Sequence, residues 1–279
     1  MNKTLSLDAD GGVDISIPLN FNGIQPNAYG VLPASSTACE SGTLVGDTRQ
    51  GGSCNFEQYT FIPHCSGTHT ECVGHITRER ISVRDCLRDI FIRAALVSVT
   101  PEEAFECGEI YPVEYCRSDV IITRRILETA LSAFDALDGP APRMPIPGSY
   151  VGPASTALII RTLPNDESKL SRKYDDPVPP YLSTEAMQFI VDRGFRHLLV
   201  DLPSVDRLYD DGKLSNHRLF WNVEPGGFEL NAETRVNSTV TELIYVPEDA
   251  IDGEYLLNLQ IAPFAADASP SRPVIFKIA

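Results

Sequence analysis

The stretch from His64 to His75 holds the densest set of reactive side chains in the sequence. It reads His-Cys-Ser-Gly-Thr-His-Thr-Glu-Cys-Val-Gly-His and contains three of the five histidines, two of the seven cysteines and one carboxylate. Imidazole, thiolate and carboxylate groups are the side chains that bind zinc, manganese or iron in proteins. The stretch therefore predicts a metal site.

The spacing within this stretch indicates which side chains share one face. Cys65, His69 and Glu71 lie four and two positions apart, so an extended segment would point all three to the same side. The glycines of the stretch disfavour a helix. His64 is the alternative first ligand, because a bulge would exchange it for Cys65. Cys72 has the other parity and is interpreted as a core residue. A nucleophilic cysteine paired with histidine is the competing interpretation.

A complete metal site needs ligands from elsewhere in the chain. The remaining histidines are His197 and His217. His197 opens an apolar run and is interpreted as structural, whereas His217 is predicted in a loop that leads into an aromatic strand and is the better ligand candidate. Glu242 lies in the β-branched run Ser-Thr-Val-Thr-Glu-Leu-Ile-Tyr-Val. A buried unpaired acid is costly there, so Glu242 either faces solvent or pairs with a cation.

Hydrophobic patterns along the chain predict strands alternating with a few helices. The helix after Thr123 is expected to end at Gly139-Pro140, and the helix after Ser183 at Gly194. The expected strands are 13–18, 57–63, 91–99, 157–161, 197–201, 238–246 and 255–262, with turns at 144–153 and a surface loop at 164–180. These elements predict an α/β fold with a mixed sheet and flanking helices, in one domain covering residues 1–279.

Composition narrows the possible partners and compartment. The chain has 279 residues, 43% of them hydrophobic, and a formal net charge of −15. This acidity and the lack of a basic run argue against nucleic acid and anionic membranes as partners. The N-terminus lacks a long apolar segment typical of a signal peptide, and no apolar run is long enough to span a bilayer. An odd number of cysteines, with none after Cys116, predicts reduced thiols and a cytoplasmic protein.

The histidine-rich stretch resembles the signature H-x-G-T-H-x-D-x-P-x-H of the cyclase-like metal-dependent hydrolases, the family of bacterial kynurenine formamidase and isatin hydrolase. Aligned on Gly67-Thr68-His69, Cys65 replaces the first histidine, Glu71 the aspartate and Val73 the proline, and His75 matches the last histidine. Val200-Asp-Leu-Pro-Ser-Val-Asp206 also resembles the family segment G-(I/V)-D-x-x-S-x-D. The similarity extends over most of the chain.

This resemblance implies a swivelling β/β/α fold, a homo-dimer or homo-tetramer, and one or two divalent ions, zinc or manganese. The residues that it implies as metal ligands are Cys65 (or His64 in its place), His69, Glu71, His217 and Glu242, with Glu71 able to bridge two ions. His75 is implied as the acid/base residue. A thiolate in the first position favours zinc, and the longer Glu71 side chain and Val73 set this chain apart from the kynurenine formamidases of tryptophan catabolism.

The expected function is hydrolysis of an amide, formamide or lactam bond of a small molecule by metal-activated water, in the manner of an arylformamidase. Aromatic residues at 59, 61, 220 and 221 are candidates for an aryl pocket, although core packing is the alternative. Two other functions fit the same residues. One is a metal-dependent cyclase or dehydratase, and the other is a metal-binding protein without catalytic activity.

Overall fold

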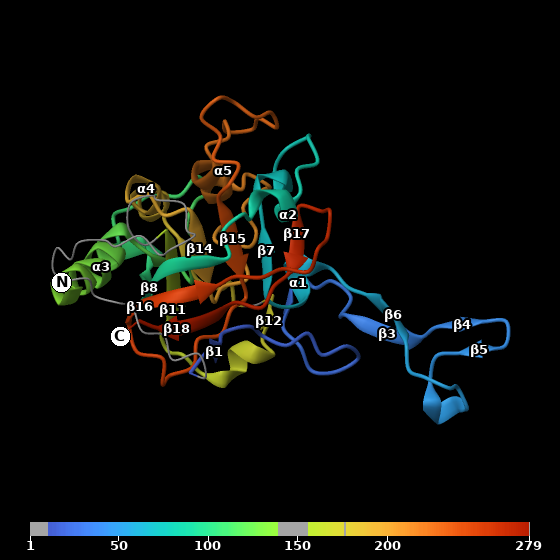
Figure 1. The fold of residues 1–279 in the computed structure, drawn as a ribbon. Coiled ribbons are helices and arrows are strands. Elements are labelled where there is room, and N and C mark those ends of the chain that lie inside the picture. The colour runs from blue at the N-terminus through green and yellow to red at the C-terminus, as the bar shows by residue number, and fades with distance from the viewer. Residues whose placement is uncertain (1–10, 139–155, 176, 279) are drawn as a thin grey trace.

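The computed structural model describes residues 11–138, 156–175 and 177–278. Its centre is a nine-stranded sheet with the order β1-β18-β16-β8-β11-β14-β15-β7-β17. The central strands β8, β11, β14 and β15 run parallel to one another. The strands at both edges run antiparallel to their neighbours. The sheet is therefore mixed, as the sequence predicts, and Figure 1 shows the helices gathered mainly along one side of it.

The elements have the following bounds. The strands of the large sheet are β1 (Val13–Asp14), β7 (His69–Glu71), β8 (Phe91–Val99), β11 (Ala157–Thr162), β14 (His197–Val200), β15 (Thr239–Glu242), β16 (Gly253–Asn258), β17 (Ala268–Pro270) and β18 (Val274–Lys277). Smaller sheets contain β2 (Asn27–Ala28), β3 (Ser35–Ala38), β4 (Glu40–Ser41), β5 (Leu44–Val45), β6 (Glu57–Thr60), β9 (Glu102–Glu103), β10 (Val120–Ile122), β12 (Lys173–Tyr174) and β13 (Tyr181–Leu182). The α-helices are α1 (Pro63–Ser66), α2 (Val83–Cys86), α3 (Arg124–Asp138), α4 (Thr184–Asp192) and α5 (Ser215–Trp221). Short 3₁₀ turns are η1 (Thr48–Gln50), η2 (Val73–His75), η3 (Ala104–Glu106) and η4 (Glu167–Leu170).

Both faces of the central strands are buried, because alternate side chains enter two different hydrophobic clusters. On one face, Val97 and Leu158 pack with residues of the long helices, such as Leu127 of α3 and Met187 of α4. On the other face, Leu96 packs with residues of β16, β18 and the N-terminal segment. This double burial explains why β8 and β11 are almost continuous apolar runs rather than alternating ones.

Several sequence predictions are confirmed. Strand β8 has the predicted bounds, β11 extends one residue beyond the prediction, and α4 begins after Ser183, whose side chain accepts a hydrogen bond from the Ala186 backbone N–H. Helix α3 begins directly after Thr123. The predicted turns at 144–153 and the Gly139-Pro140 helix stop lie outside the described residues.

Other predictions are wrong. The strand predicted at 57–63 ends at Thr60, and Pro63 instead starts the helical turn α1. The loop predicted to carry His217 is the helix α5. The segment predicted as a surface loop at 164–180 contains η4 and β12, and it buries Lys169, whose ammonium group lies 2.8 Å from Asp201.

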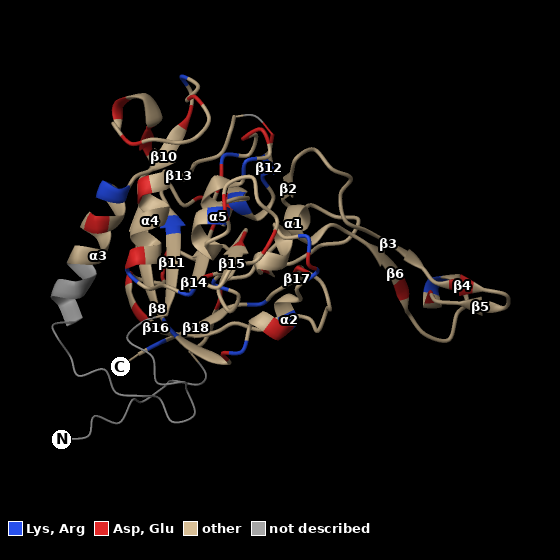
Figure 2. Ribbon diagram, turned by 90° about the horizontal axis from the view of Figure 1, so that it is seen from above, with Lys and Arg blue, Asp and Glu red and all other residues tan. Residues whose placement is uncertain are grey.

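An arm extends from the body between residues 35 and 60. It consists of the antiparallel pairs β3–β6 and β4–β5, and both Figure 1 and Figure 2 show it reaching well away from the large sheet. Its large apolar side chains include Leu44, Phe56 and Tyr59, all of which are exposed. The arm therefore adds apolar surface without adding to the core.

Candidate metal centre

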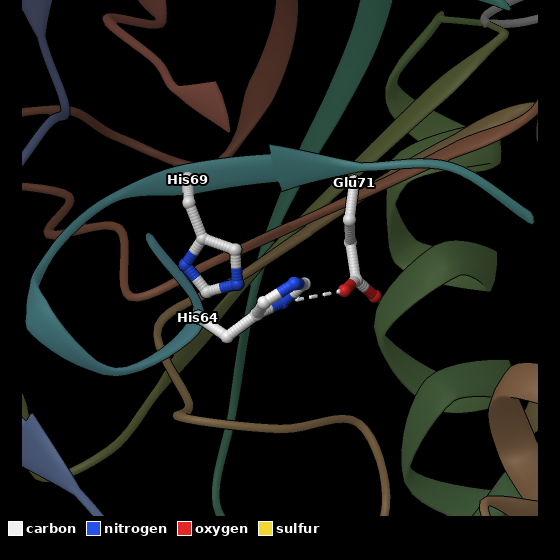
Figure 3. A group of neighbouring side chains, drawn as sticks. All are labelled: His64, His69 and Glu71. Carbon is white, nitrogen blue, oxygen red and sulfur yellow. Dashed lines mark ion pairs between the residues drawn. The ribbon is translucent and has the colours of Figure 1, made fainter. Parts of the chain in front are cut away.

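Strand β7 presents two of the candidate ligands from one face. His69 and Glu71 are the first and last residues of β7, and both are fully buried. The ring of His64, supplied by the preceding helical turn α1, lies against them, with Nδ1 3.0 Å from Oε2 of Glu71. Figure 3 shows His69 and Glu71 extending from the same side of the strand, with the His64 ring facing both. The chain therefore folds back on itself at Gly67 to bring three potential ligands together.

Thr68 fixes this turn. Its hydroxyl donates to the backbone carbonyl of Leu243 and accepts a hydrogen bond from the Ile17 backbone N–H at 2.7 Å. The turn is thereby tied both to the end of β15 and to the N-terminal segment. Next along the chain, a Cβ at Gly74 would lie 2.2 Å from the backbone oxygen of Ile81, so only glycine fits in the 3₁₀ turn that leads to His75.

Strand β15 and helix α5 supply the distant candidates. Glu242 is the direct cross-strand partner of His69, and its Oε2 lies 3.4 Å from Nε2 of His69. Helix α5 positions His217, whose Nε2 lies 2.9 Å from Oε1 of Glu71 and 3.6 Å from Oε1 of Glu242. The structure therefore brings His69, Glu71, His217 and Glu242 together, although nearly 150 residues separate Glu71 from His217.

A second layer of contacts orients His217. Its Nδ1 lies 2.6 Å from Oδ2 of Asp206, which is itself buried and accepts hydrogen bonds from the Tyr111 hydroxyl and the Asn216 backbone N–H. A carboxylate at Nδ1 holds the proton on that nitrogen and leaves Nε2 free to bind a metal ion. The pairing of imidazole with an outer carboxylate is typical of metal-binding histidines.

His75 lies at the partly open side of the cluster. Its Nδ1 is 3.7 Å from Oε2 of Glu71 and 3.5 Å from Oδ2 of Asp267, and a quarter of its side chain is exposed. Asp267 also lies 3.0 Å from Nε2 of His64. The chain approaches this point through β17, which begins at the next residue and pairs with β7. His75 thus borders the cluster while remaining accessible to solvent.

Cys65 is not among the side chains whose potential ligand atoms group together in the described residues. Potential metal-binding atoms gather within 4.8 Å of one another in three overlapping sets, which contain His64, His69, Glu71, His75, His217 and Asp267. Cys65 is buried in α1, and its burial together with nearby Glu242 raises the pKa of its thiol to about 11. In the helical turn α1, successive side chains point in different directions, and it is the His64 ring that lies against Glu71.

The remaining sequence interpretations concern buried residues. Cys72 is fully buried and packs with Val83 and Cys86, as the core interpretation predicted. His197 is also fully buried, and its ring nitrogens lie 2.8 Å from the Thr239 hydroxyl and 3.1 Å from Asp89. Both ring nitrogens of His197 are therefore satisfied by residues that do not belong to the metal centre.

The aromatic candidates do not form one pocket. Phe220 and Trp221 are fully buried in the main hydrophobic cluster. Tyr59 is exposed on the arm, and the Phe61 ring lies 6.4 Å from Phe264. The interpretation of Phe220 and Trp221 as core residues is therefore the correct one.

Two buried atoms indicate that the cluster fits a cation. Nε2 of His69 and Oε2 of Glu71 are both inaccessible to solvent, and neither forms a hydrogen bond within the described residues. Their charged neighbours, Glu242 at 3.4 Å and His64 at 3.0 Å, are close but lack hydrogen-bond geometry. The other ring nitrogen of His69 lies 3.0 Å from the backbone carbonyl of Gly67, to which it can donate, and this leaves a lone pair on Nε2. Unpartnered buried polar atoms are costly, and a metal ion would satisfy both of these.

The pKa shifts of the clustered side chains also indicate that positive charge is favoured at this place. Burial opposes ionisation of Glu71, yet His75 and His217 hold the pKa of its carboxyl well below the ordinary value. Burial likewise opposes protonation of His64, but Asp267 and Glu71 raise its pKa to about 10. Hydrogen bonds from His64 and His75 lower the pKa of Asp267. The carboxylates thus favour positive charge at this place, whether it comes from protons or from a divalent ion.

Comparison with known proteins agrees with this geometry. The model of the Cyclase family matches residues 13–207. The chain belongs to the Cyclase family. This confirms the resemblance that the histidine-rich stretch indicates, and the match includes that stretch and Asp206 but ends before His217 and Glu242. No curated protein shows a significant sequence match.

Solved structures of the Cyclase-family type share the fold. A predicted metal-dependent hydrolase from Bacillus stearothermophilus is 12% identical, with a TM-score of 0.53 and coverage of 98% of this chain and 99% of that one. Isatin hydrolase A from Labrenzia aggregata, bound to benzyl benzoate, is 13% identical, with a TM-score of 0.59 over 96% of this chain and 94% of that one. Isatin hydrolase A from Ralstonia solanacearum is 13% identical, with a TM-score of 0.60 over 95% and 91%. In the part of the chain that the structure describes, no helix is long and apolar enough to cross a bilayer.

Proposed function

We propose that this protein is a metal-dependent hydrolase that cleaves an amide, formamide or lactam bond of a small molecule. The observation that carries the proposal is the pair of buried atoms without a hydrogen bond, Nε2 of His69 and Oε2 of Glu71, beside His64 and His217. Membership of the Cyclase family and the fold shared with isatin hydrolases support the hydrolytic chemistry.

The proposed ligands are His69, Glu71 and His217, with Glu242 beside them and His64 in the first position. His64 is preferred over Cys65 because its ring reaches Glu71 at 3.0 Å, whereas Cys65 is absent from the grouped ligand atoms. With His64 in place of a thiolate, the donors are imidazoles and carboxylates, which suit zinc and manganese alike. Glu71 contacts both His64 and His217 through different oxygens, so it is suited to bridge two ions.

The chain's own residues define how the reaction would proceed. A divalent ion at this site would lower the pKa of a bound water molecule from 15.7 to about 7 and would polarise a substrate carbonyl. His75 lies next to the ligands and is partly exposed, so it can take a proton from the attacking water and return it to the leaving nitrogen. Asp267 lies 3.5 Å from Nδ1 of His75 and would orient the ring, which leaves Nε2 as the nitrogen that exchanges the proton.

The test compares metal-free and metal-loaded protein on one panel of substrates. N-formylkynurenine, isatin and simple aryl amides would be offered with zinc or manganese, in water enriched in ¹⁸O. We expect turnover only with metal, and one solvent oxygen in the carboxylate product. Turnover without oxygen incorporation would favour the cyclase or dehydratase alternative. Stoichiometric metal without turnover across the panel would favour a non-catalytic metal-binding protein.

We further propose that the protein is a cytoplasmic homo-dimer or homo-tetramer. All seven cysteines are free, which suits a reducing compartment. The exposed apolar side chains of the arm suit a contact with another copy of the chain. Light scattering of the purified protein, with and without residues 35–60, tests the assembly, and a monomer at micromolar concentration would overturn it.

A further inference from the structure

Helix α5 has a second face that borders a cavity. His217 and Trp221 point toward the metal centre and the core, and their rings lie 5.5 Å apart. Ser215, Arg218 and Leu219 lie on the opposite side of the helix and line a cavity of about 860 Å³ between α4, α5 and the loop after α5. Both Figure 1 and Figure 2 show α4 and α5 side by side. This volume is typical of a binding site for a small organic molecule.

The lining of the cavity combines apolar residues with three cations. Its apolar residues include Val191 and Phe228, whereas its charged residues are Lys213, Arg218 and Arg235 with the single carboxylate Glu224. Three cations against one acid is an unusual balance in a chain with a net charge of −15. The cavity therefore differs in charge from the protein as a whole.

These three cations have no acidic partner among the ion pairs of the described residues. Lys213 donates to the backbone carbonyl of Pro112 at 2.8 Å. Arg218 donates to the backbone carbonyls of Lys213, Glu224 and Gly227.

Arg235 donates to the backbone carbonyls of Phe220 and Phe195. Burial and the neighbouring Arg196 lower its pKa to about 10. Backbone carbonyls orient guanidinium groups but carry no formal charge, so the described lining keeps an excess of positive charge over its single carboxylate, Glu224.

We propose that this cavity is a second binding site, separate from the metal centre, for a small organic carboxylate with an aromatic or aliphatic body. The apolar residues would cover the body, and the cations of the lining, Arg218, Arg235 and Lys213, would supply the positive charge that attracts the carboxylate. Arginine favours such planar anions because its guanidinium can donate two parallel hydrogen bonds. Because α5 carries His217 on its other face, the occupant would touch the helix that positions a metal ligand.

The experiment measures binding of 2-naphthoate by isothermal titration calorimetry to the full chain stripped of metal, so that the metal centre cannot bind the carboxylate. 2-Naphthalenemethanol, which has the same rings without the charge, is the neutral comparison. We expect one site per chain and binding of the carboxylate at least about tenfold tighter than binding of the alcohol, as suits a charge-assisted hydrogen bond. Equal affinities, or binding seen only after metal is restored, would overturn the proposal.

Variants locate the site. Gln188→Trp, at an exposed wall position of α4, narrows the cavity without removing a cation and should weaken binding. Arg235→Gln should weaken it about tenfold. Arg88→Gln, an exposed arginine outside the lining, is the matched control and should bind as the unmodified chain does. Should Arg235→Gln fail to fold, Gln188→Trp decides alone, and unchanged binding in that variant would refute the assignment.

Discussion

Asp206→Asn is expected to weaken metal binding without touching a ligand. Asp206 lies 2.6 Å from Nδ1 of His217 and keeps the proton on that nitrogen. An asparagine amide can donate to Nδ1 instead, which favours the tautomer with its proton on Nε2, and a protonated Nε2 cannot bind a metal ion. Loss of such an outer carboxylate weakens metal affinity about 10- to 100-fold, or about 1.4 to 2.7 kcal/mol.

The assay is a competition between metal-free protein and a fluorescent zinc chelator, with thermal melts to verify folding. Tyr111→Phe is the matched control, because it removes only the hydroxyl that donates to Oδ1 of Asp206 at 2.7 Å. This control should keep a zinc affinity within a few-fold of the unmodified chain. Unchanged zinc affinity in Asp206→Asn would refute the role given to His217. An equal loss in both variants would show that the surrounding hydrogen bonds, and not the tautomer, set the affinity.

Three further predictions concern histidines and the neighbouring thiol. In the chelator competition, His64→Ala should lose at least about tenfold in zinc affinity while Cys65→Ala keeps it, and the reverse order would assign the first position to the thiolate. His75→Ala should retain metal but lower kcat about 10²- to 10⁴-fold, and retained turnover would remove His75 from the acid/base role. Burial lowers the pKa of His197 below 6.5, so the unfolded chain binds a proton that the folded chain does not, and stability should fall as the pH drops through about 6.5. Measured by urea unfolding, the free energy of unfolding should fall less between about pH 7 and about pH 5 in His197→Gln than in the unmodified chain, and metal affinity should not change. An equal pH dependence in the two proteins, or loss of metal binding in the variant, would contradict this.

The local half of the site could be predicted from the sequence. The even spacing of His69 and Glu71 is that of a strand, and β7 places both on one face. The long apolar runs of β8 and β11 likewise predicted two strands, and the structure places them in the middle of the sheet, where burial of both faces removes the alternation. These are short-range patterns that need no knowledge of tertiary contacts.

One local feature of the sequence indicates a helical turn, and not an extended segment, at His64 and Cys65. Pro63 occupies the first position of α1, and proline there is typical of a helix start. A helical turn separates the directions of neighbouring side chains, so it turns His64 toward Glu71. Recognition of this turn would have favoured His64 from the sequence alone.

The rest of the site depends on tertiary contacts. Helix α5 has only seven residues and is bounded by Leu214 and Asn222 in left-handed conformations, without a side-chain cap at its start. Asp267 lies 203 positions from His64, and only the pairing of β17 with β7 brings it to the cluster. The polar segment 164–180, which includes Lys169, is typical of a surface loop, yet Lys169 is buried in an ion pair with Asp201. No periodicity in the sequence reports such contacts.

Anomalous diffraction from crystals grown with zinc or manganese, recorded on both sides of the metal's absorption edge, would locate the ion among the side chains of the metal centre. We expect each peak to lie within about 2.0 to 2.2 Å of a carboxylate oxygen of Glu71 and of Nε2 of His69 or Nε2 of His217. A fully loaded protein whose anomalous peak lies away from these three side chains, or crystals without a peak despite added metal, would contradict it.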